Sequence, residues 1–359
     1  MLVHICCSVD SHFFLEKLQH DYPQEKLTGF FYDPNIHPYS EYKLRLLDVK
    51  RSCKKLGIEL LEGTYDYENW IEAVRGLEKE PEKGARCEVC FDKRFIESAN
   101  KALEIGEKTF TTTLLVSPLK SQEQLKKSGE DFELKYGVKF IAPDYRSGGG
   151  TQDQSRVTKE EQLYRQDYCG CIYGLDMQRK HQDRLMDEMM SEISNRILPA
   201  SIEERIELYT KRIELEEEGK EYKIVKEKFL NYRIFSCTMK TKENSVAVYP
   251  LIYSLLPRKN VQTTFHFTAN NLHYYNRDEI IFITLEDFNT ACHTNYKDIK
   301  ELIYNPLTIE EEVKLRERLG YGGYNLTPIF VTNEIVMTKV EITLDAKIYE
   351  DTREKLIII

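Results

Sequence analysis

The sequence predicts an α/β fold: a Rossmann-like, parallel-sheet domain in the first half and a second domain of the α+β class. In the first half, short apolar and β-branched segments alternate with helical patterns, which predicts a parallel sheet covered on both faces. After about residue 190 the chain becomes a charged helical stretch, followed by strand-like segments rich in tyrosine. We therefore expect two domains, residues 1–189 and 190–359, as suits a chain of 359 residues.

Five strands are expected in the first domain, at residues 2–7, 27–33, 58–63, 109–117 and 139–145. Each is a short run of apolar or β-branched residues bounded by polar or turn-forming ones. Helical spacing over residues 10–22 and 39–56 places a helix after each of the first two strands. Pro38 suits the first turn of the second helix, because its φ angle is already helical.

Polar and thiol side chains recur where these strands end. In open α/β sheets, ligands bind beyond the carboxyl ends of the strands. A site is therefore expected at this edge of the sheet. The candidates there are Cys6, Cys7 and Asp10 after the first strand, Asp33 and His37 after the second, Thr113, Ser117 and Lys120 at the fourth, and Asp144 and Arg146 at the fifth.

The composition indicates a globular protein without a membrane partner. The chain is 41% hydrophobic and 31% charged, and it has no apolar run near the roughly 20 residues of a membrane helix. Its first residues lack the basic region of a signal peptide, so a cytoplasmic location is expected. The net charge of −9 argues against nucleic-acid binding by overall charge. Lys43, Lys50, Arg51, Lys54 and Lys55 form a candidate basic face on the helix at 39–56, but the pattern favours a solvated helix face over a binding surface.

Six of the nine cysteines form three close pairs. The pairs are Cys6 with Cys7, Cys87 with Cys90, and Cys169 with Cys171. In a reducing compartment such clusters are more typical of metal binding or redox chemistry than of structural disulfides. The other three, Cys53, Cys237 and Cys292, have no nearby ligand type and are expected to be structural.

The Cys87-x-x-Cys90 pair has the spacing that clamps a metal ion or one face of a cluster. Flanking Arg86, Lys93 and Arg94, together with a helix N-terminus, are expected to favour the thiolate form.

The pair Cys169-Gly170-Cys171 has two interpretations. A disulfide across one residue is strained and easily reduced, which suits a redox switch. Gly170 would let the backbone turn between the two thiols. Alternatively, both thiolates ligate metal.

The number of thiols favours iron–sulfur chemistry. A [4Fe–4S] cluster takes four thiolates, and six are available. The surplus pair, with Asp10, is then a candidate for holding a second metal ion or for acting as a redox dithiol. A single structural zinc would leave the surplus pair without a role.

Six motifs together resemble the epoxyqueuosine reductase family of the QueH type. They are HICC, FYDPNIHP, CEVCFDKR, TTTLLVSPLK, DYRSGGG and LYRQDYCGCIYGL, and they occur in the family's order over about residues 1–175. The resemblance implies reduction of the epoxide of epoxyqueuosine at the wobble position of a tRNA anticodon loop. It also implies an iron–sulfur cluster, independence from cobalamin, and a nucleotide-binding α/β fold of the HUP type. It does not cover the second domain.

The resemblance also implies roles for individual residues. Cys6, Cys7, Cys87 and Cys90 match the family's cluster-associated cysteines. Cys169 and Cys171 match its final pair, which is either a redox-active dithiol or a set of further metal ligands. Asp10 stands where many members have a third cysteine, and it is a candidate ligand of a second, mononuclear iron.

The implied reaction needs two electrons, a proton donor and a side chain on which the modified nucleobase can stack. An external electron donor is required as a partner. The candidate proton donors are His37, Lys120 and Tyr168. The base is expected to stack on an aromatic side chain, and the candidates are Phe31, Tyr32, Tyr39 and Tyr164.

Two alternatives come from other functional classes. The first is an ATP-dependent tRNA-modifying enzyme of the PP-loop type, because CCSVDS resembles an altered S-G-G-x-D-S loop. Cys7 and Ser8 replace its glycines, however, and their Cβ atoms would obstruct a pyrophosphate. The second is a zinc-stabilised RNA-binding module, which would be colourless and would not turn over with reductant.

Overall fold

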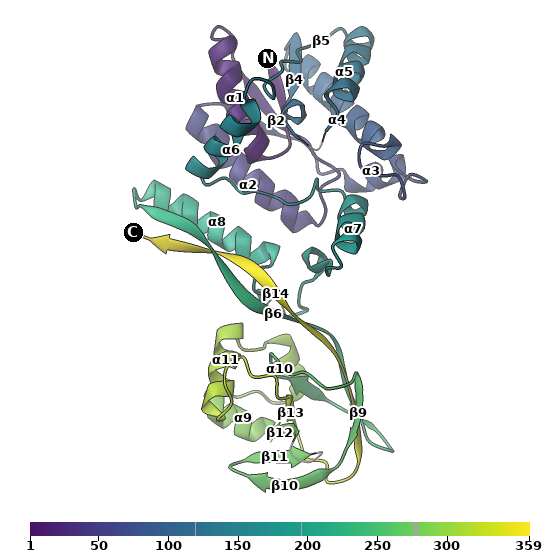
Figure 1. The fold of residues 1–359 in the computed structure, drawn as a ribbon, viewed down its shortest axis with the longest axis vertical. Coiled ribbons are helices and arrows are strands. Elements are labelled where there is room, and N and C mark those ends of the chain that lie inside the picture. Colours follow the sequence, from purple (N-terminus) through teal and green to yellow (C-terminus); the bar gives the residue numbers. More distant parts are fainter. Residues whose placement is uncertain (119, 195, 276–278) are drawn as a thin grey trace. The chain divides into compact units, whose positions relative to one another are not determined.

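The chain divides into two compact units (Figure 1). The computed structural model describes residues 1–118, 120–194, 196–275 and 279–359, so Leu119 of the TTTLLVSPLK motif lies outside the described residues. The first unit comprises Met1–Met189, Arg205–Ile224 and Leu356–Ile359, and the second Met190–Glu204 and Val225–Lys355.

The first unit is built on a five-stranded parallel sheet, as predicted. Its strands are β1 (Leu2–Ile5), β2 (Thr28–Phe31), β3 (Glu59–Glu62), β4 (Thr109–Thr112) and β5 (Lys139–Phe140). They lie in the order β3-β2-β1-β4-β5 with parallel pairing throughout. All four residues of β1 and of β2 are buried, because helices cover both faces.

Two groups of helices cover this sheet on opposite faces (Figure 1). On one face α1 packs against α2 and α6, and on the other α4 packs against α5 and α3. The helices are α1 (Ser8–Asp21), α2 (Tyr39–Leu56), α3 (Tyr67–Ala73), α4 (Ala85–Glu104), α5 (Gln122–Tyr136), α6 (Gly150–Glu160) and α7 (Ile172–His181). The helices expected at residues 10–22 and 39–56 are therefore confirmed as α1 and α2.

The strand order reverses at β1, so the crevice between the ends of β1 and β4 is the topological switch point. The strand expected over residues 109–117 is shorter than predicted and ends at Thr112. There the Thr112 side chain accepts a hydrogen bond of 3.2 Å from the Leu114 amide and caps a 3₁₀ turn, Thr113–Leu115. This turn places Thr113 at the switch point.

Helix α8 (Ile202–Glu217) lies largely in the first unit, although the sequence analysis put all residues after 189 in the second domain. Arg212 of α8 is fully buried and forms an ion pair with buried Asp48 of α2. Arg51 of α2 donates hydrogen bonds of 2.6 and 2.8 Å to the Glu216 carboxylate of α8. These long-range charge pairs explain why residues 205–224 pack with the first unit.

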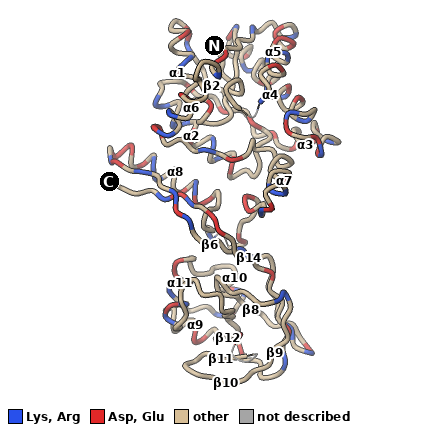
Figure 2. The backbone as a smooth tube through the Cα atoms, in the orientation of Figure 1, with Lys and Arg blue, Asp and Glu red and all other residues tan. Residues whose placement is uncertain are grey.

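The candidate basic face on α2 is largely neutralised by carboxylates, which agrees with the favoured interpretation that it is not a binding surface. Carboxylates pair with four of its five cations: Glu62 with Lys50, Glu216 with Arg51, Glu217 with Lys54, and Glu161 with Lys55. The acidic positions of α8 can be followed in Figure 2. Lys43 instead places its ammonium 4.8 Å from the centre of the Tyr39 ring.

The second unit is of the α+β class, as predicted. Its mixed sheet has the order β10-β11-β12-β13-β8, and a second sheet has the order β7-β6-β14-β9. The strands are β6 (Tyr222–Lys240), β7 (Ser245–Val246), β8 (Val248–Pro250), β9 (Asn260–Thr263), β10 (Phe265–Ala269), β11 (Leu272–Tyr275), β12 (Ile280–Thr284), β13 (Ile329–Thr332) and β14 (Val340–Ile358). The helices are α9 (Leu285–Cys292), α10 (Ile299–Tyr304) and α11 (Ile309–Arg318). In the described parts of both units, no helix is long and apolar enough to cross a membrane.

Candidate functional site

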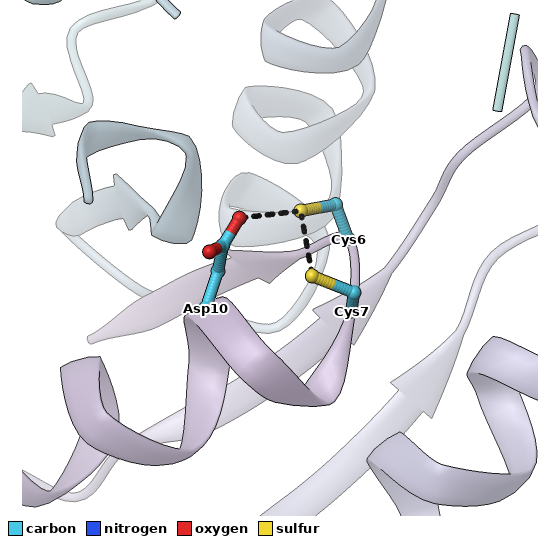
Figure 3. Close-up of side chains that lie close together, drawn as sticks. All are labelled: Cys6, Cys7 and Asp10. Carbon is cyan, nitrogen blue, oxygen red and sulfur yellow. Dashed lines mark hydrogen bonds between the residues drawn. The ribbon is translucent and has the colours of Figure 1, made fainter. Parts of the chain in front are cut away.

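Two thiols and a carboxylate meet at the switch point (Figure 3). Cys6 and Cys7 follow β1, and Asp10 lies in the first turn of α1. The Cys6 sulfur lies 3.8 Å from the Cys7 sulfur and 3.8 Å from an Asp10 oxygen. Thr113 and Gln154 contact the same group, with Thr113 Oγ1 3.7 Å from the Cys6 sulfur and Gln154 Nε2 donating to Asp10 at 2.7 Å.

This group has the donor atoms and the burial of a metal site. The three ligand atoms lie within 4.8 Å of one another, and it is the one such group among the residues that the structure describes. The hydrogen bond between Cys6 and Cys7, followed by burial, raises the pKa of the Cys7 thiol well above its usual value. Burial also raises the pKa of the Asp10 carboxyl. A bound cation would offset the cost of burying these acidic groups in their charged form.

The second thiol pair lies in the first turns of α4. Cys87, Cys90 and Arg94 are spaced by three and four residues, so they share one face of the helix. The helix N-terminus expected near this pair is confirmed, but the expected lowering of the thiol pKa is wrong for Cys87. Burial raises the pKa of Cys87, against the opposing charge of Lys120 and a 3.3 Å hydrogen bond from the Lys83 amide.

The third pair lies in the loop before α7 and is held by the segment after β2. The His37 amide donates to the Gly170 carbonyl at 2.9 Å, and the Asn35 side chain donates to the Cys169 carbonyl at 3.3 Å. Gly170 adopts φ +98°, and a Cβ there would lie 2.7 Å from Ile36 Cγ1. The turn expected at Gly170 is confirmed, and its tight packing requires glycine.

The two thiols of this loop have opposite protonation preferences. A hydrogen bond from Cys171 holds the pKa of Cys169 well below its usual value, and the charges of Lys120 and Arg45 act in the same direction. The same hydrogen bond raises the pKa of Cys171 far above its usual value. These directions favour the thiolate at Cys169 over that at Cys171, which suits either metal ligation or thiol chemistry at Cys169.

Lys120 joins the thiol groups electrostatically. Burial opposes its charged form, but electrostatic interactions with Cys169 and Cys87 outweigh burial and raise the pKa of the ammonium. Its charge also acts on the Asp10 carboxyl, whose pKa it lowers against the effect of burial. The positive charge of Lys120 thus interacts with residues of all three thiol-bearing segments.

The other two predicted proton donors lie at the edge of this group. The His37 ring stacks on Tyr67 with 4.5 Å between centroids, and its Nδ1 has no hydrogen-bond partner among the described residues. Burial lowers the pKa of His37. Tyr168 is buried, and its hydroxyl donates to the His37 carbonyl at 2.7 Å. Their roles as proton donors stay predictions.

Only one of the predicted stacking side chains is open to solvent. Tyr39 is 47% exposed, whereas Phe31, Tyr32 and Tyr164 are at most 4% exposed and belong to the core. These three cannot receive a base in this structure, because their rings already pack inside the first unit.

Two further residues, Arg45 and Glu82, interact with Cys169 and carry no local sequence signal. Arg45 donates to the Tyr168 carbonyl at 3.0 Å, and its charge lowers the pKa of Cys169. Glu82 is a hydrogen-bond partner of Cys169, and burial raises the pKa of its carboxyl. Neither residue carries a local signal, because each meets Cys169 through folding over long sequence distances.

The chain has clear relatives of one kind. The family described as "Epoxyqueuosine reductase QueH" matches residues 1–177. A protein named epoxyqueuosine reductase QueH from Helicobacter pylori is 39% identical over 353 residues, which cover 93% of this chain and 94% of that one. A protein of the same name from Histophilus somni is 38% identical over 49% of this chain and 72% of its own length. The one from Thermotoga maritima is 36% identical over 51% of this chain and 94% of its own length.

A solved structure gives a weaker similarity. It is described as the U34-tRNA thiolase NcsA from Methanococcus maripaludis with its [4Fe-4S] cluster. It shares 14% identity, covers 54% of this chain and 77% of that one, and has a TM-score of 0.25. A similarity at this level carries no argument about the site. The Helicobacter relative, in contrast, matches both units at high identity, and so this chain belongs to the QueH family and is an epoxyqueuosine reductase.

Proposed function

We propose that this chain reduces epoxyqueuosine in the anticodon loop of a tRNA, using a [4Fe–4S] cluster held by its clustered thiols and electrons from an external donor. The observation that carries the proposal is the distribution of charge around those thiols. Lys120 and Arg94 both lie near cysteines of more than one pair. A set of buried and half-buried cysteines with cations acting on it suits an anionic, thiolate-bound cluster.

The residues fit such a cluster by the chemistry of their donor atoms. Soft thiolates are the ligands that iron–sulfur clusters take, and Cys6, Cys7, Cys87 and Cys90 are the proposed ligands. Asp10 and the pair Cys169 and Cys171 remain, either as ligands of a second, mononuclear iron or, for the cysteines, as a redox dithiol. Zinc alone would occupy four ligands and leave this surplus unexplained.

The proposed reaction consumes two electrons, from an external donor, and two protons. Both carbon–oxygen bonds of the epoxide break, a carbon–carbon double bond forms, and the oxygen leaves as water after taking up two electrons and two protons. A bound cluster would deliver those electrons one at a time from the external donor. The ammonium of Lys120 is the proposed donor of the first proton, because negative charge develops on the departing oxygen and a half-buried cation stabilises it.

We propose that the first unit catalyses this reaction. The family match covers residues 1–177, and 51% of this chain accounts for 94% of the Thermotoga relative. The domain of residues 1–189, completed by α8, would then carry the reaction. Family membership favours this function over the ATP-dependent enzyme and the zinc-stabilised RNA-binding module considered above.

The proposal is tested on full-length protein purified without oxygen. Iron, sulfide and zinc are quantified per chain, and dithionite-reduced protein is mixed with tRNA that carries epoxyqueuosine. We expect about four sulfides and at least four irons per chain, the composition of one cluster, together with queuosine in the tRNA. A colourless protein that holds zinc and no sulfide after anaerobic reconstitution would contradict the cluster.

Tyr39 is the proposed stacking platform for a nucleobase. It is the exposed end of an aromatic group in which Tyr39 lies 5.7 Å from Tyr42 and 4.8 Å from Tyr65, measured between ring centroids. Lys43 holds its ammonium over the Tyr39 ring. An exposed ring with a cation beside it suits a base and its phosphate, because stacking and charge act together on single-stranded RNA.

Replacement of Tyr39 by alanine is expected to weaken tRNA binding about tenfold, within the range of about 1–3 kcal/mol for loss of one stacked base. The measurement is the Kd for tRNA by fluorescence anisotropy, with Tyr39→Phe as the control that keeps the ring. Equal affinities for Tyr39→Ala and the wild type would remove Tyr39 from the binding surface.

A further inference from the structure

The charge of one buried cation, Arg94, interacts with one cysteine of each of the three thiol pairs. Arg94 lies on α4 and is 3% exposed. It lies one helical turn beyond Cys90, and its partner Asn35 donates a hydrogen bond to the Cys169 carbonyl. Burial disfavours the charged form of Arg94, yet its interactions with Cys90, Asp33, Cys6 and Cys169 outweigh that effect and raise its pKa. Arg94 also shares one face of α4 with Cys87 and Cys90.

Arg94 is itself held by a buried carboxylate. Asp33 follows β2, is 1% exposed, and has an oxygen 3.2 Å from Arg94 Nη1. Asn35 accepts a hydrogen bond from Arg94 Nη2. Asn35 therefore holds one guanidinium nitrogen by a hydrogen bond, and Asp33 lies beside a second as an ion-pair partner. The third, Nε, has no hydrogen-bond partner among the described residues.

Burial raises the pKa of Asp33 to about 6, and the charges of Arg94, Arg45 and Lys120 act against burial. His4 Nε2 lies 3.9 Å from the same Asp33 oxygen, but it shares a closer contact of 3.0 Å with the Tyr32 carbonyl. That carbonyl accepts the proton of Nε2, so Nδ1 accepts from Thr112 at 2.9 Å. Burial lowers the pKa of His4 to about 3, so the ring is neutral. Arg94 thus forms the ion pair with Asp33, and its charge also interacts with Cys90, Cys6 and Cys169.

We propose that Arg94 and Asp33 set the reduction potential of the iron–sulfur site with opposite signs. This rests on the proposed cluster. Reduction adds one negative charge to a cluster that thiolates already make anionic. A cation nearby stabilises that added charge and an anion destabilises it, because the interaction in a buried site is poorly screened. Asp33 is then a positioning residue, since it also holds the guanidinium against the thiol set.

The test is a redox titration of the anaerobically reconstituted full chain, followed by visible absorbance and electron paramagnetic resonance. Arg94→Gln is expected to lower the equilibrium constant for one-electron reduction about tenfold, which corresponds to about 59 mV towards lower potential. Asp33→Asn keeps the shape of the side chain and removes the negative charge, so it is expected to shift the potential upwards by a similar amount. Arg94→Lys keeps the charge and is expected to stay near the wild type.

Lys101→Gln provides a matched control. Lys101 lies on the same helix, seven residues beyond Arg94, and pairs with exposed Glu104. Its removal is expected to leave the potential unchanged. A purely structural role for Arg94 and Asp33 would not produce shifts of opposite sign.

The outcomes separate this inference from the proposed function. A wild-type chain without sulfide-bound iron overturns the proposed function and this inference with it. A wild-type chain that holds the cluster, with variants whose potentials do not move or move in the same direction, overturns the inference alone. If Arg94→Gln fails to hold iron, Asp33→Asn decides: an upward shift supports the proposal, and an unchanged potential overturns it.

Discussion

Replacement of Cys169 by serine is expected to lower epoxide reduction at least about 10³-fold, the scale on which loss of an essential group acts. Cys169 is the thiol that a neighbouring hydrogen bond and the charges of Lys120 and Arg45 hold as a thiolate. A serine hydroxyl stays protonated at neutral pH and is a poor ligand for soft iron. Both proposed roles of Cys169, metal ligand and redox thiol, are therefore lost together.

The measurement is single-turnover conversion of epoxyqueuosine in tRNA, with iron and sulfide counted on the same sample. A variant with fewer irons identifies Cys169 as a ligand, and a variant with full iron but no turnover identifies it as a redox thiol. Cys292→Ser is the control, because Cys292 ends α9 in the second unit, in a cluster of apolar side chains. Activity of Cys169→Ser within tenfold of the wild type would exclude both roles.

Replacement of Asp48 by alanine is expected to destabilise the first unit by about 3–5 kcal/mol, the typical cost of removing one partner from a buried ion pair. Asp48 accepts hydrogen bonds from the Arg212 side chain, the Ser8 hydroxyl and, at 2.7 Å, the Tyr164 amide. Asp48 and Arg212 are fully buried. Without the carboxylate, the Arg212 charge stays buried without its counter-ion and two further donors lose their acceptor.

Urea unfolding followed by tryptophan fluorescence measures this effect in the first unit. The chain has a single tryptophan, and Trp70 is fully buried in the first unit. Glu217→Ala is the control, because Glu217 pairs with Lys54 at the surface and exposed pairs contribute about 0–1 kcal/mol. A loss below about 1 kcal/mol for Asp48→Ala would show that α8 does not depend on this pair.

Much of the first unit follows from local sequence. The strands at β1 and β2 are short apolar runs, and the helices α1 and α2 have helical spacing. Their alternation is enough to predict a parallel sheet and a site at the carboxyl ends of its strands. The fourth strand was predicted too long for a local reason. The Thr112 side chain caps a 3₁₀ turn, so β4 ends at Thr112 although the β-branched residues continue beyond it.

The sequence predicted charged groups less well, because the pairing and the protonation state of a side chain depend on residues distant in the sequence. The cations of α2 look like a binding face until Glu216 and Glu217 of α8 pair with two of them. Similarly, the residues flanking Cys87 predicted a lowered thiol pKa, but burial raises it. Burial and pairing are properties of the folded chain, and a local window does not contain them.

The sequence by itself determined that Cys6, Cys7 and Asp10 lie together, because they fall at a strand end and in the first turn of the following helix. It also determined that Cys87, Cys90 and Arg94 share a helix face, because their spacing is helical. Only the tertiary structure brought Cys169 to these groups, through contacts of its loop with Asn35 and His37. The physical reason is that such contacts join segments more than 100 residues apart, and their geometry is set by how the sheet and its loops pack rather than by local preference.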